Sequence, residues 1–184
     1  MQQFNQTISE FDNRSLRSRL GRFATGITVV TVKDAGGHYI GRTINSFASV
    51  SLDPPLILWS LNRFSTSLRA FASMEHFAVH VLGADQVSTA ERFAKMGTRD
   101  PFHDHDVSEG LGGVPIIHGC AVVFECRKYD LHSAGDHIVF FGEILRIRET
   151  EKPGLVFHNG SYALSRPHPA LRGKRPESFY FSPF

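Results

Sequence analysis

The chain has 184 residues, of which 41% are hydrophobic and 21% are charged. One globular domain of this length buries roughly 70% of the surface that its unfolded chain exposes, so it can fold without a structural metal or a disulfide bond. Its 20 basic and 18 acidic residues are nearly balanced and form no basic block, which argues against nucleic-acid binding.

The N-terminal residues do not form a cationic start followed by an apolar segment. No stretch of the chain approaches the roughly 18 to 20 apolar residues that a membrane span requires. We therefore expect a cytoplasmic protein with no membrane partner. If Cys120 and Cys126 share one extended strand, they lie about 20 Å apart and cannot form a disulfide within it, so we expect buried, reduced thiols.

Helix and strand signals alternate irregularly in the first third of the chain. Leu16, Leu20 and Phe23 recur at helical spacing, which predicts a short amphipathic helix over residues 15–24. Residues 27–33 are apolar and β-branched. A glycine turn follows them, so residues 38–43 are expected to return as the second strand of a hairpin.

The middle of the chain predicts two buried strands, residues 55–61 and 77–82, and two short helices. The first helix is expected over residues 65–72 with Ser65 as its N-cap. The second is expected over residues 85–94 with Asp85 as its cap.

Two long β segments follow, residues 120–131 and 137–148, joined by residues 133–136. Apolar side chains occupy both alternating sets of positions in the second segment, so both of its faces are expected to be buried. About seven strands, a few short helices and no regular strand–helix alternation predict a mainly β, closed or sandwiched antiparallel architecture.

Small polar side chains gather within residues 41–58, ahead of a paired proline that leads into an apolar strand. They supply donors and acceptors of the kind that phosphate, hydroxyls and ring carbonyls require, and they are Thr43, Asn45, Ser46, Ser49 and Ser51. Taken alone, the segment is explained more simply as a Ser/Thr-rich surface turn than as a ligand-binding loop.

Other signals for chemistry are weaker. Neither a dinucleotide-binding GxGxxG nor a phosphate-binding P-loop is present. Residues 103–106 read His-Asp-His-Asp, but they lack a partner motif and are interpreted as a solvated loop, so no metal site is expected. Gly135, Asp136 and His137 place an imidazole where a hairpin turn meets a strand, either as a functional group or as a turn residue.

Seven motifs stand in the order found in the short-chain flavin reductase family, the reductases that supply reduced flavin to two-component flavin-dependent monooxygenases. They are LGRFATGITVVT (20–31), GRTINSFASVSLDPPLIL (41–58), FAVHVL (77–82), RFA followed by Asp100-Pro101-Phe102, GVPIIHGCAVVFEC (113–126), GDHIVFFGEI (135–144) and NGSYAL (159–164). The chain resembles this family over residues 16–164.

The resemblance implies a split β-barrel of the FMN-binding type with Greek-key strands, and a homodimer with flavin near the subunit interface. It implies three groups of site residues. Those expected beside the flavin ring are Thr43, Asn45, Ser46 and Phe47, with Ser49 and Ser51 following. Those expected at its phosphate are Arg63, Ser65, Thr66 and Ser67. Those associated with the nicotinamide nucleotide are Gly135, Asp136 and His137, with His137 orienting the nicotinamide.

The activity implied is an NAD(P)H:flavin oxidoreductase that transfers hydride from NADH or NADPH to FMN or FAD and supplies a partner monooxygenase. Arg42 and Ile44 occupy positions where smaller residues are common in the family, and Phe64 interrupts the phosphate segment, so FMN and FAD both stay open. A flavin-binding electron carrier or sensor without nicotinamide turnover is the alternative, and a plain interaction module is a third hypothesis. Residues 1–165 are expected to form the reductase domain and residues 166–184 a tail rich in Pro, Arg and aromatic residues.

Overall fold

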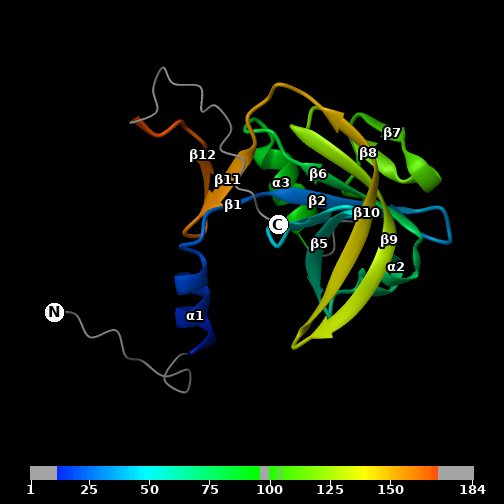
Figure 1. Ribbon diagram of the computed structural model, residues 1–184, viewed down its shortest axis with the longest axis horizontal. Coiled ribbons are helices and arrows are strands. Elements are labelled where there is room, and N and C mark those ends of the chain that lie inside the picture. Colours follow the sequence, from blue (N-terminus) through cyan, green and yellow to red (C-terminus); the bar gives the residue numbers. More distant parts are fainter. Residues whose placement is uncertain (1–11, 96–99, 104, 170–184) are drawn as a thin grey trace.

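The computed structural model describes residues 12–95, 100–103 and 105–169 (Figure 1). Its helices are α1 (Asn13–Leu20), α2 (Leu68–Ser73), α3 (Val87–Ala94) and the 3-10 helix η2 (Leu111–Gly113). Its strands are β1 (Thr25–Gly26), β2 (Thr28–Lys33), β3 (Tyr39–Ile44), β4 (Ala48–Leu52), β5 (Pro55–Asn62), β6 (His76–Val81), β7 (Val107–Glu109), β8 (Pro115–Ile117), β9 (Val122–Ala134), β10 (His137–Glu149), β11 (Leu155–His158) and β12 (Ser161–Leu164). The predicted mainly β fold with short helices is confirmed.

Seven strands form one antiparallel sheet in the order β3-β2-β6-β9-β10-β5-β4. Hairpins join β2 to β3, β4 to β5 and β9 to β10, whereas β6 pairs with both β2 and β9. Strands distant in the chain thus become neighbours, as in a Greek key. The sheet curls, but β3 and β4 remain at its two edges, so the barrel is split and not closed (Figure 1).

The β9–β10 hairpin is the longest ribbon of the sheet. Its turn consists of Gly135, at φ 60°, and Asp136, so the connection is shorter than predicted. Of β10, only Phe140 and Gly142 are buried, and Leu145 and Ile147 are exposed. The expectation that both faces of this strand are buried is therefore wrong, because the face with Leu145 and Ile147 is exposed in its C-terminal half.

The hydrophobic core consists of two clusters on opposite faces of the sheet. Val29 faces the first cluster, which α3 covers through Phe93. Val30 faces the second cluster, which contains Trp59 and the α2 residue Phe71. Because successive strand residues point to opposite faces, the nearly continuous apolar run of β2 is explained by burial on both sides.

Two fully buried polar side chains tie loops to this core. His80 approaches the Val29 carbonyl oxygen with Nδ1 at 3.0 Å, and its Nε2 accepts a 3.0 Å hydrogen bond from the Ile117 N–H. The Glu125 carboxylate accepts hydrogen bonds from the Leu111 N–H at 2.7 Å and from Arg148 Nε at 2.8 Å. Each group is satisfied, as buried polar groups must be.

Helix α1 is shorter and more exposed than predicted. The Asp12 carboxylate caps it by accepting from the Ser15 N–H, and the Gly21 N–H closes its end on the Arg17 carbonyl. None of its residues is buried, and Phe23, which was expected within the helix, lies beyond it.

The caps predicted for the other two helices are wrong. Ser67, not Ser65, holds the N-cap position of α2, and Ser65 Oγ accepts from the Ser67 N–H in a local turn. Gln86 holds the N-cap position of α3, and the Asp85 carboxylate instead pairs with Lys152 at 2.8 Å.

Several short strands were not predicted. β11 pairs with β1 and β12 in a separate sheet, and β7 pairs with β8. The turn of the β4–β5 hairpin contains a cis Asp53–Pro54 peptide.

Cys120 and Cys126 are free and buried, as expected, and burial raises their thiol pKa values to about 11 and about 12.

Within the described ranges, no helix is long and apolar enough to cross a membrane. Most of the tail predicted from Arg166 onward lies outside the described residues.

Candidate functional site

The first group of predicted site residues lies where β3 ends and the chain turns into β4. The Thr43 hydroxyl donates a 2.7 Å hydrogen bond to the Ala90 carbonyl oxygen of α3. Asn45 lies just beyond β3 and its side chain is exposed. Thr43 thus anchors the end of β3, which leaves Asn45 as the side chain of this pair that is open to a ligand.

Ser46 connects this loop to the other edge of the sheet. Its hydroxyl donates to the Ser60 carbonyl oxygen at 3.2 Å and accepts from the Ser60 N–H at 2.9 Å. Phe47 follows, and its ring stacks on Phe124 with centroids 5.8 Å apart and an interplanar angle of 9°. Both side chains therefore fix the loop within the protein, on the open side of the split barrel.

Ser49 and Ser51 lie on β4, beyond this loop. Ser49 is exposed, whereas Ser51 Oγ accepts a 3.2 Å hydrogen bond from the Asp53 N–H in the hairpin turn. These two serines therefore belong to β4 and not to the loop that contains Asn45 and Ser46, and their role in flavin binding stays a prediction.

The second group, residues 63–67, forms the turn between β5 and α2. The Ser65 N–H donates to the Asn62 carbonyl at 2.9 Å, which shapes the turn, and Ser67 is buried. Arg63 and Thr66 are exposed. The turn therefore presents a cation and a hydroxyl to solvent, as an anion-binding segment does.

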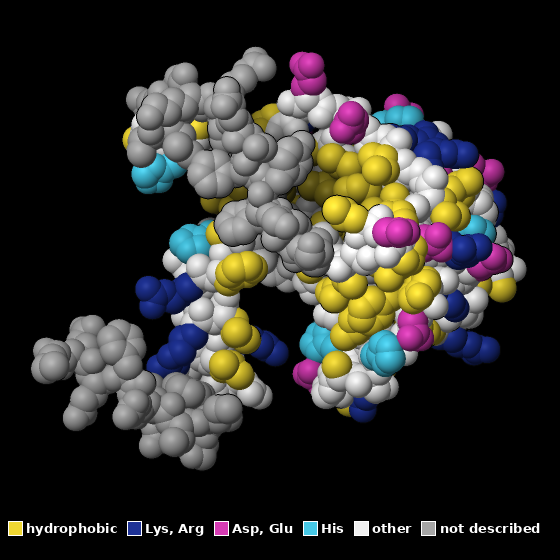
Figure 2. Space-filling view, in the orientation of Figure 1, with side chains coloured by type: hydrophobic (Ala, Val, Ile, Leu, Met, Phe, Trp, Pro, Cys, Tyr) yellow, Lys and Arg dark blue, Asp and Glu magenta, His cyan; other side chains and the backbone are white. Residues whose placement is uncertain are grey.

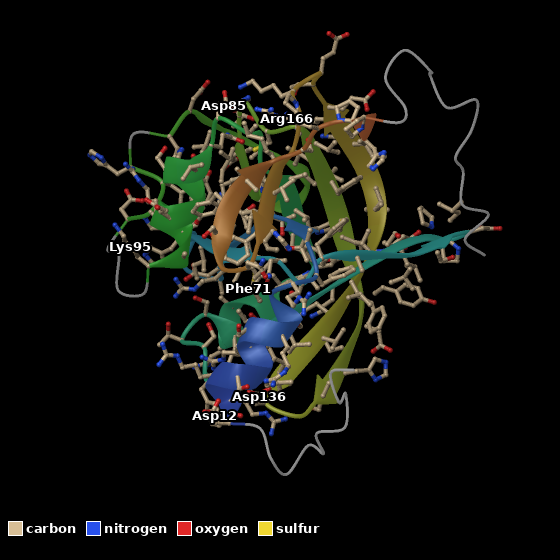
Figure 3. All side chains as sticks on the ribbon, turned by 90° about the vertical axis from the view of Figure 1, so that its left-hand side faces the viewer. Asp12, Phe71, Asp85, Lys95, Asp136 and Arg166 are labelled. Atoms are coloured by element: carbon tan, nitrogen blue, oxygen red, sulfur yellow. The ribbon has the colours of Figure 1, made fainter. Side chains whose placement is uncertain are left out.

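The third group is the β9–β10 turn, and the structure brings it against the second group. Asn62 and His137 are cross-strand partners, and the Arg63 N–H donates to the Asp136 carbonyl at 2.9 Å. Asp136 lies at the tip of the hairpin (Figure 3). The predicted phosphate segment and the predicted nicotinamide segment are thus adjacent.

His137 is oriented by its neighbour. Its Nδ1 lies 2.7 Å from Asp136 Oδ1, and this hydrogen bond is the largest cause that lowers the pKa of the Asp136 carboxyl. An imidazole held through Nδ1 leaves Nε2 for a ligand. The ring can therefore contact a nucleotide without losing its support.

Arg42, which the sequence presents only as a departure from the family, contacts the predicted phosphate segment. It projects from β3 on the face shared with Ile40 and Ile44, and its Nη2 donates a 3.3 Å hydrogen bond to Thr66 Oγ1. Arg42 therefore links β3 to the phosphate segment. The signal that points to it is a charged residue in the middle of an apolar strand face.

A cavity of about 340 Å³ adjoins Asn45, and its other lining residues include Leu20, Phe23, Thr25 and Phe157. The Thr25 hydroxyl is buried and lacks a hydrogen-bond partner among the described residues. Aromatic walls with a few polar groups fit a planar ring that has a polar edge. The residues present therefore fit a flavin: aromatic and amide groups for the ring, and arginines with hydroxyls for a phosphate.

The described side chains were also compared with the ligands that a metal site requires. Within the part of the chain that the structure describes, no group of three or more His, Cys, Asp or Glu side chains is placed to hold a metal ion. Asp104, within the His-Asp-His-Asp run, lies outside the described residues.

Comparison with known proteins defines the class. Residues 20–164 match the model of the flavin reductase like domain. The chain therefore belongs to the flavin reductase-like family.

Its relatives share this class along most of the chain. It is 46% identical to an FMN reductase (NADH) of Agrobacterium fabrum, over 82% of this chain and 85% of that protein. It is 36% identical to the reductase component of a flavin-dependent trigonelline monooxygenase of Acinetobacter baylyi, over 81% of this chain but 48% of that protein. Some relatives are thus about twice as long as the segment they share with this chain.

Solved structures agree with the fold. The NADH:FAD oxidoreductase of Streptomyces globisporus, solved with NAD and FAD fragments, superposes with a TM-score of 0.82 at 34% identity. The match covers 90% of this chain and 99% of that one. The split barrel implied by the sequence motifs is therefore confirmed.

Proposed function

We propose that the protein is an NADH-dependent flavin reductase that transfers hydride from reduced nicotinamide to FMN or FAD and supplies reduced flavin to a partner monooxygenase. One observation carries the proposal: the loop after β3, the turn of residues 63–67 and the turn of residues 135–137 are joined in space. Ser46 of the loop bonds to Ser60 of β5, the strand that leads into the turn of residues 63–67. Arg42 of β3 bonds to Thr66 in that turn, and the Arg63 N–H bonds to the Asp136 carbonyl. The names of the relatives support NADH and flavin as the reactants.

The chemistry requires little of the protein beyond binding and orientation. A bound flavin accepts the hydride and supplies the redox chemistry, so no protein nucleophile is needed. The chain supplies Asn45 and the backbone of its loop beside the ring, the turn of residues 63–67 at a phosphate, and His137 at the nicotinamide side. Their joint task is to bring the reacting atoms to roughly 3 to 3.5 Å.

The test is an anaerobic titration of FMN with NADH in the presence of a catalytic amount of the protein, followed at the flavin absorbance. We expect all of a large molar excess of FMN to be bleached, because reduced flavin must leave the protein for each new turnover. Bleaching of one equivalent only indicates an electron carrier that does not release flavin. No bleaching with NADH or NADPH contradicts the proposal.

We also propose that the protein acts as a homodimer. None of the residues of α1 is buried, and Leu20 and the following Phe23 are 65% and 79% exposed. Figure 2 shows hydrophobic side chains exposed on α1, beside a gap that separates the helix from the barrel. A second copy that fills this gap would cover them, and the cavity at Asn45 would then adjoin the subunit interface.

Light scattering coupled to size-exclusion chromatography tests this assembly. We expect the mass of a dimer, and a Leu20→Glu, Phe23→Glu double variant should shift the mass toward that of a monomer. A wild-type protein that elutes as a monomer at all concentrations contradicts the proposal.

Two further assignments complete the proposed function. We place the protein in the cytoplasm, which is supported by its two free, buried thiols. We also assign residues 1–165 to the reductase domain and residues 166–184 to a tail, which is supported by the end of the family match at residue 164.

A further inference from the structure

Arg42 occupies an unusual position for a cation. It lies in β3 between Ile40 and Ile44, whose side chains pack against the core cluster that contains Trp59. The Arg42 side chain is partly buried, and this burial lowers the pKa of its guanidinium. Loss of hydration makes such a charge costly unless other groups satisfy it.

The described residues provide few hydrogen-bond partners for the Arg42 guanidinium. Among the described residues, its only hydrogen bond is the 3.3 Å contact with Thr66 Oγ1, and no carboxylate pairs with it. An arginine carries five N–H donors in a planar fork, so most donors of Arg42 have no partner in the part of the protein that the structure describes. A partly desolvated, unpaired fork is the arrangement that binds an oxyanion in two-pronged fashion.

The surroundings of Arg42 fit a phosphoryl group. Its guanidinium contacts the exposed Thr66 hydroxyl in the turn of residues 63–67, and the same turn carries the exposed Arg63. The Arg63 side chain is exposed, whereas the Arg42 side chain is partly buried and bonded to Thr66. Of the two arginines, Arg42 is therefore the one whose position is fixed before a ligand binds.

We propose that Arg42 binds a phosphoryl group of a bound nucleotide beside Thr66. The inference deepens the proposed function and rests on it. The phosphoryl group belongs either to the flavin or to the nicotinamide dinucleotide. Both present the same chemistry to a guanidinium, so the experiment separates them.

The test compares Arg42→Met with the wild-type protein in equilibrium binding of FMN, FAD and riboflavin, followed by quenching of flavin fluorescence, and of NAD⁺ by calorimetry. For a flavin phosphate, we expect the variant to lose roughly 10- to 100-fold in FMN affinity while its riboflavin affinity stays unchanged. A loss confined to NAD⁺ assigns the phosphoryl group to the dinucleotide. An equal loss for FMN and riboflavin, or no loss for any ligand, overturns the proposal.

Three controls make the result specific. Arg42→Lys keeps the charge without the fork and should recover part of the FMN affinity. Arg69→Met removes an exposed arginine of α2 and should leave all affinities unchanged. In the wild-type protein, added inorganic phosphate should weaken the binding of FMN, or of NAD⁺ if the phosphoryl group is the dinucleotide's, more than that of riboflavin. Equal weakening for all three ligands overturns the proposal, and this measurement does not depend on the folding of Arg42→Met.

Failure of this inference is distinct from failure of the proposed function. A wild-type protein that reduces flavin with NADH, together with an Arg42→Met variant of unchanged affinities, overturns only the role of Arg42. A wild-type protein that binds no flavin overturns both.

Discussion

The backbone N–H of Arg63 donates a 2.9 Å hydrogen bond to the backbone carbonyl of Asp136. This bond continues the β5–β10 ladder one step beyond the Asn62–His137 pair. The turn that precedes α2 and the tip of the β9–β10 hairpin therefore form one rigid edge. Residues assigned by motif to two different ligands thus share a single backbone support.

His137→Ala is expected to raise the KM for NADH about tenfold, the effect of one lost hydrogen bond of roughly 1.4 kcal/mol. The KM for flavin should change less, because the imidazole lies at the nicotinamide side of the proposed site. Steady-state oxidation of NADH at varied concentrations of each substrate measures both values.

His132→Ala provides the matched control, since His132 is an exposed histidine on the same hairpin and pairs with Asp130. It should leave both KM values unchanged. Equal rises in the two KM values for His137→Ala would remove the nicotinamide role assigned to His137.

Much of the fold was readable from local patterns. The β2–β3 and β9–β10 hairpins follow from apolar runs separated by glycine turns, and the periodicity of residues 87–94 places α3 correctly. The strands β4, β11 and β12 were missed because each is short and only partly buried. Their pairing depends on partners that are distant in the chain, such as β1 for β11, which no local window reveals.

The candidate site was predicted less completely than the fold. Motif order placed all three segments, and the structure joins them, but the sequence did not show that the hydroxyls of Thr43 and Ser46 are used within the protein. It also presented Arg42 as a misfit. The use of these hydroxyls and the contact of Arg42 both depend on side-chain contacts between elements far apart in sequence. A local sequence motif does not reveal such contacts.

Ser46→Ala is expected to lower the free energy of unfolding by about 1 to 3 kcal/mol. The substitution removes the partner of both the Ser60 N–H and the Ser60 carbonyl, where the two edges of the split barrel approach. Urea denaturation measures the change. Ser161→Ala, at an exposed position of β12, should cost less than about 0.5 kcal/mol, and a similar small cost for Ser46→Ala would show that Ser46 does not hold the edges together.

Glu125→Leu is expected to destabilise the protein by about 3 to 5 kcal/mol. Glu125 is fully buried, and its removal leaves Arg148 and the Leu111 N–H without their acceptor. The surface pair of Glu143 with Arg127, at 2.6 Å, offers the comparison. Glu143→Leu should cost at most about 1 kcal/mol, and equal costs for the two substitutions would contradict the account of Glu125 as a buried anchor.

The stability of the protein should fall between neutral and mildly acidic pH because of His80. Burial is the largest cause that lowers the pKa of His80 from 6.5 to about 4. The neutral ring fits its two bonds, with Nδ1–H donating to the Val29 carbonyl and Nε2 accepting from the Ile117 N–H. Between these two pH values, His80 is therefore protonated in the unfolded chain and neutral in the folded chain.

The sign and size of the effect follow from this difference. The stabilisation is complete above pH 6.5 and is lost as the pH falls toward about 4, at a total of roughly 3 kcal/mol. Urea denaturation at several pH values measures the slope. His80→Gln is expected to be less stable at neutral pH but to lose most of this slope, because it has no group that titrates in the range. A variant that keeps the wild-type slope would assign the pH dependence to another group.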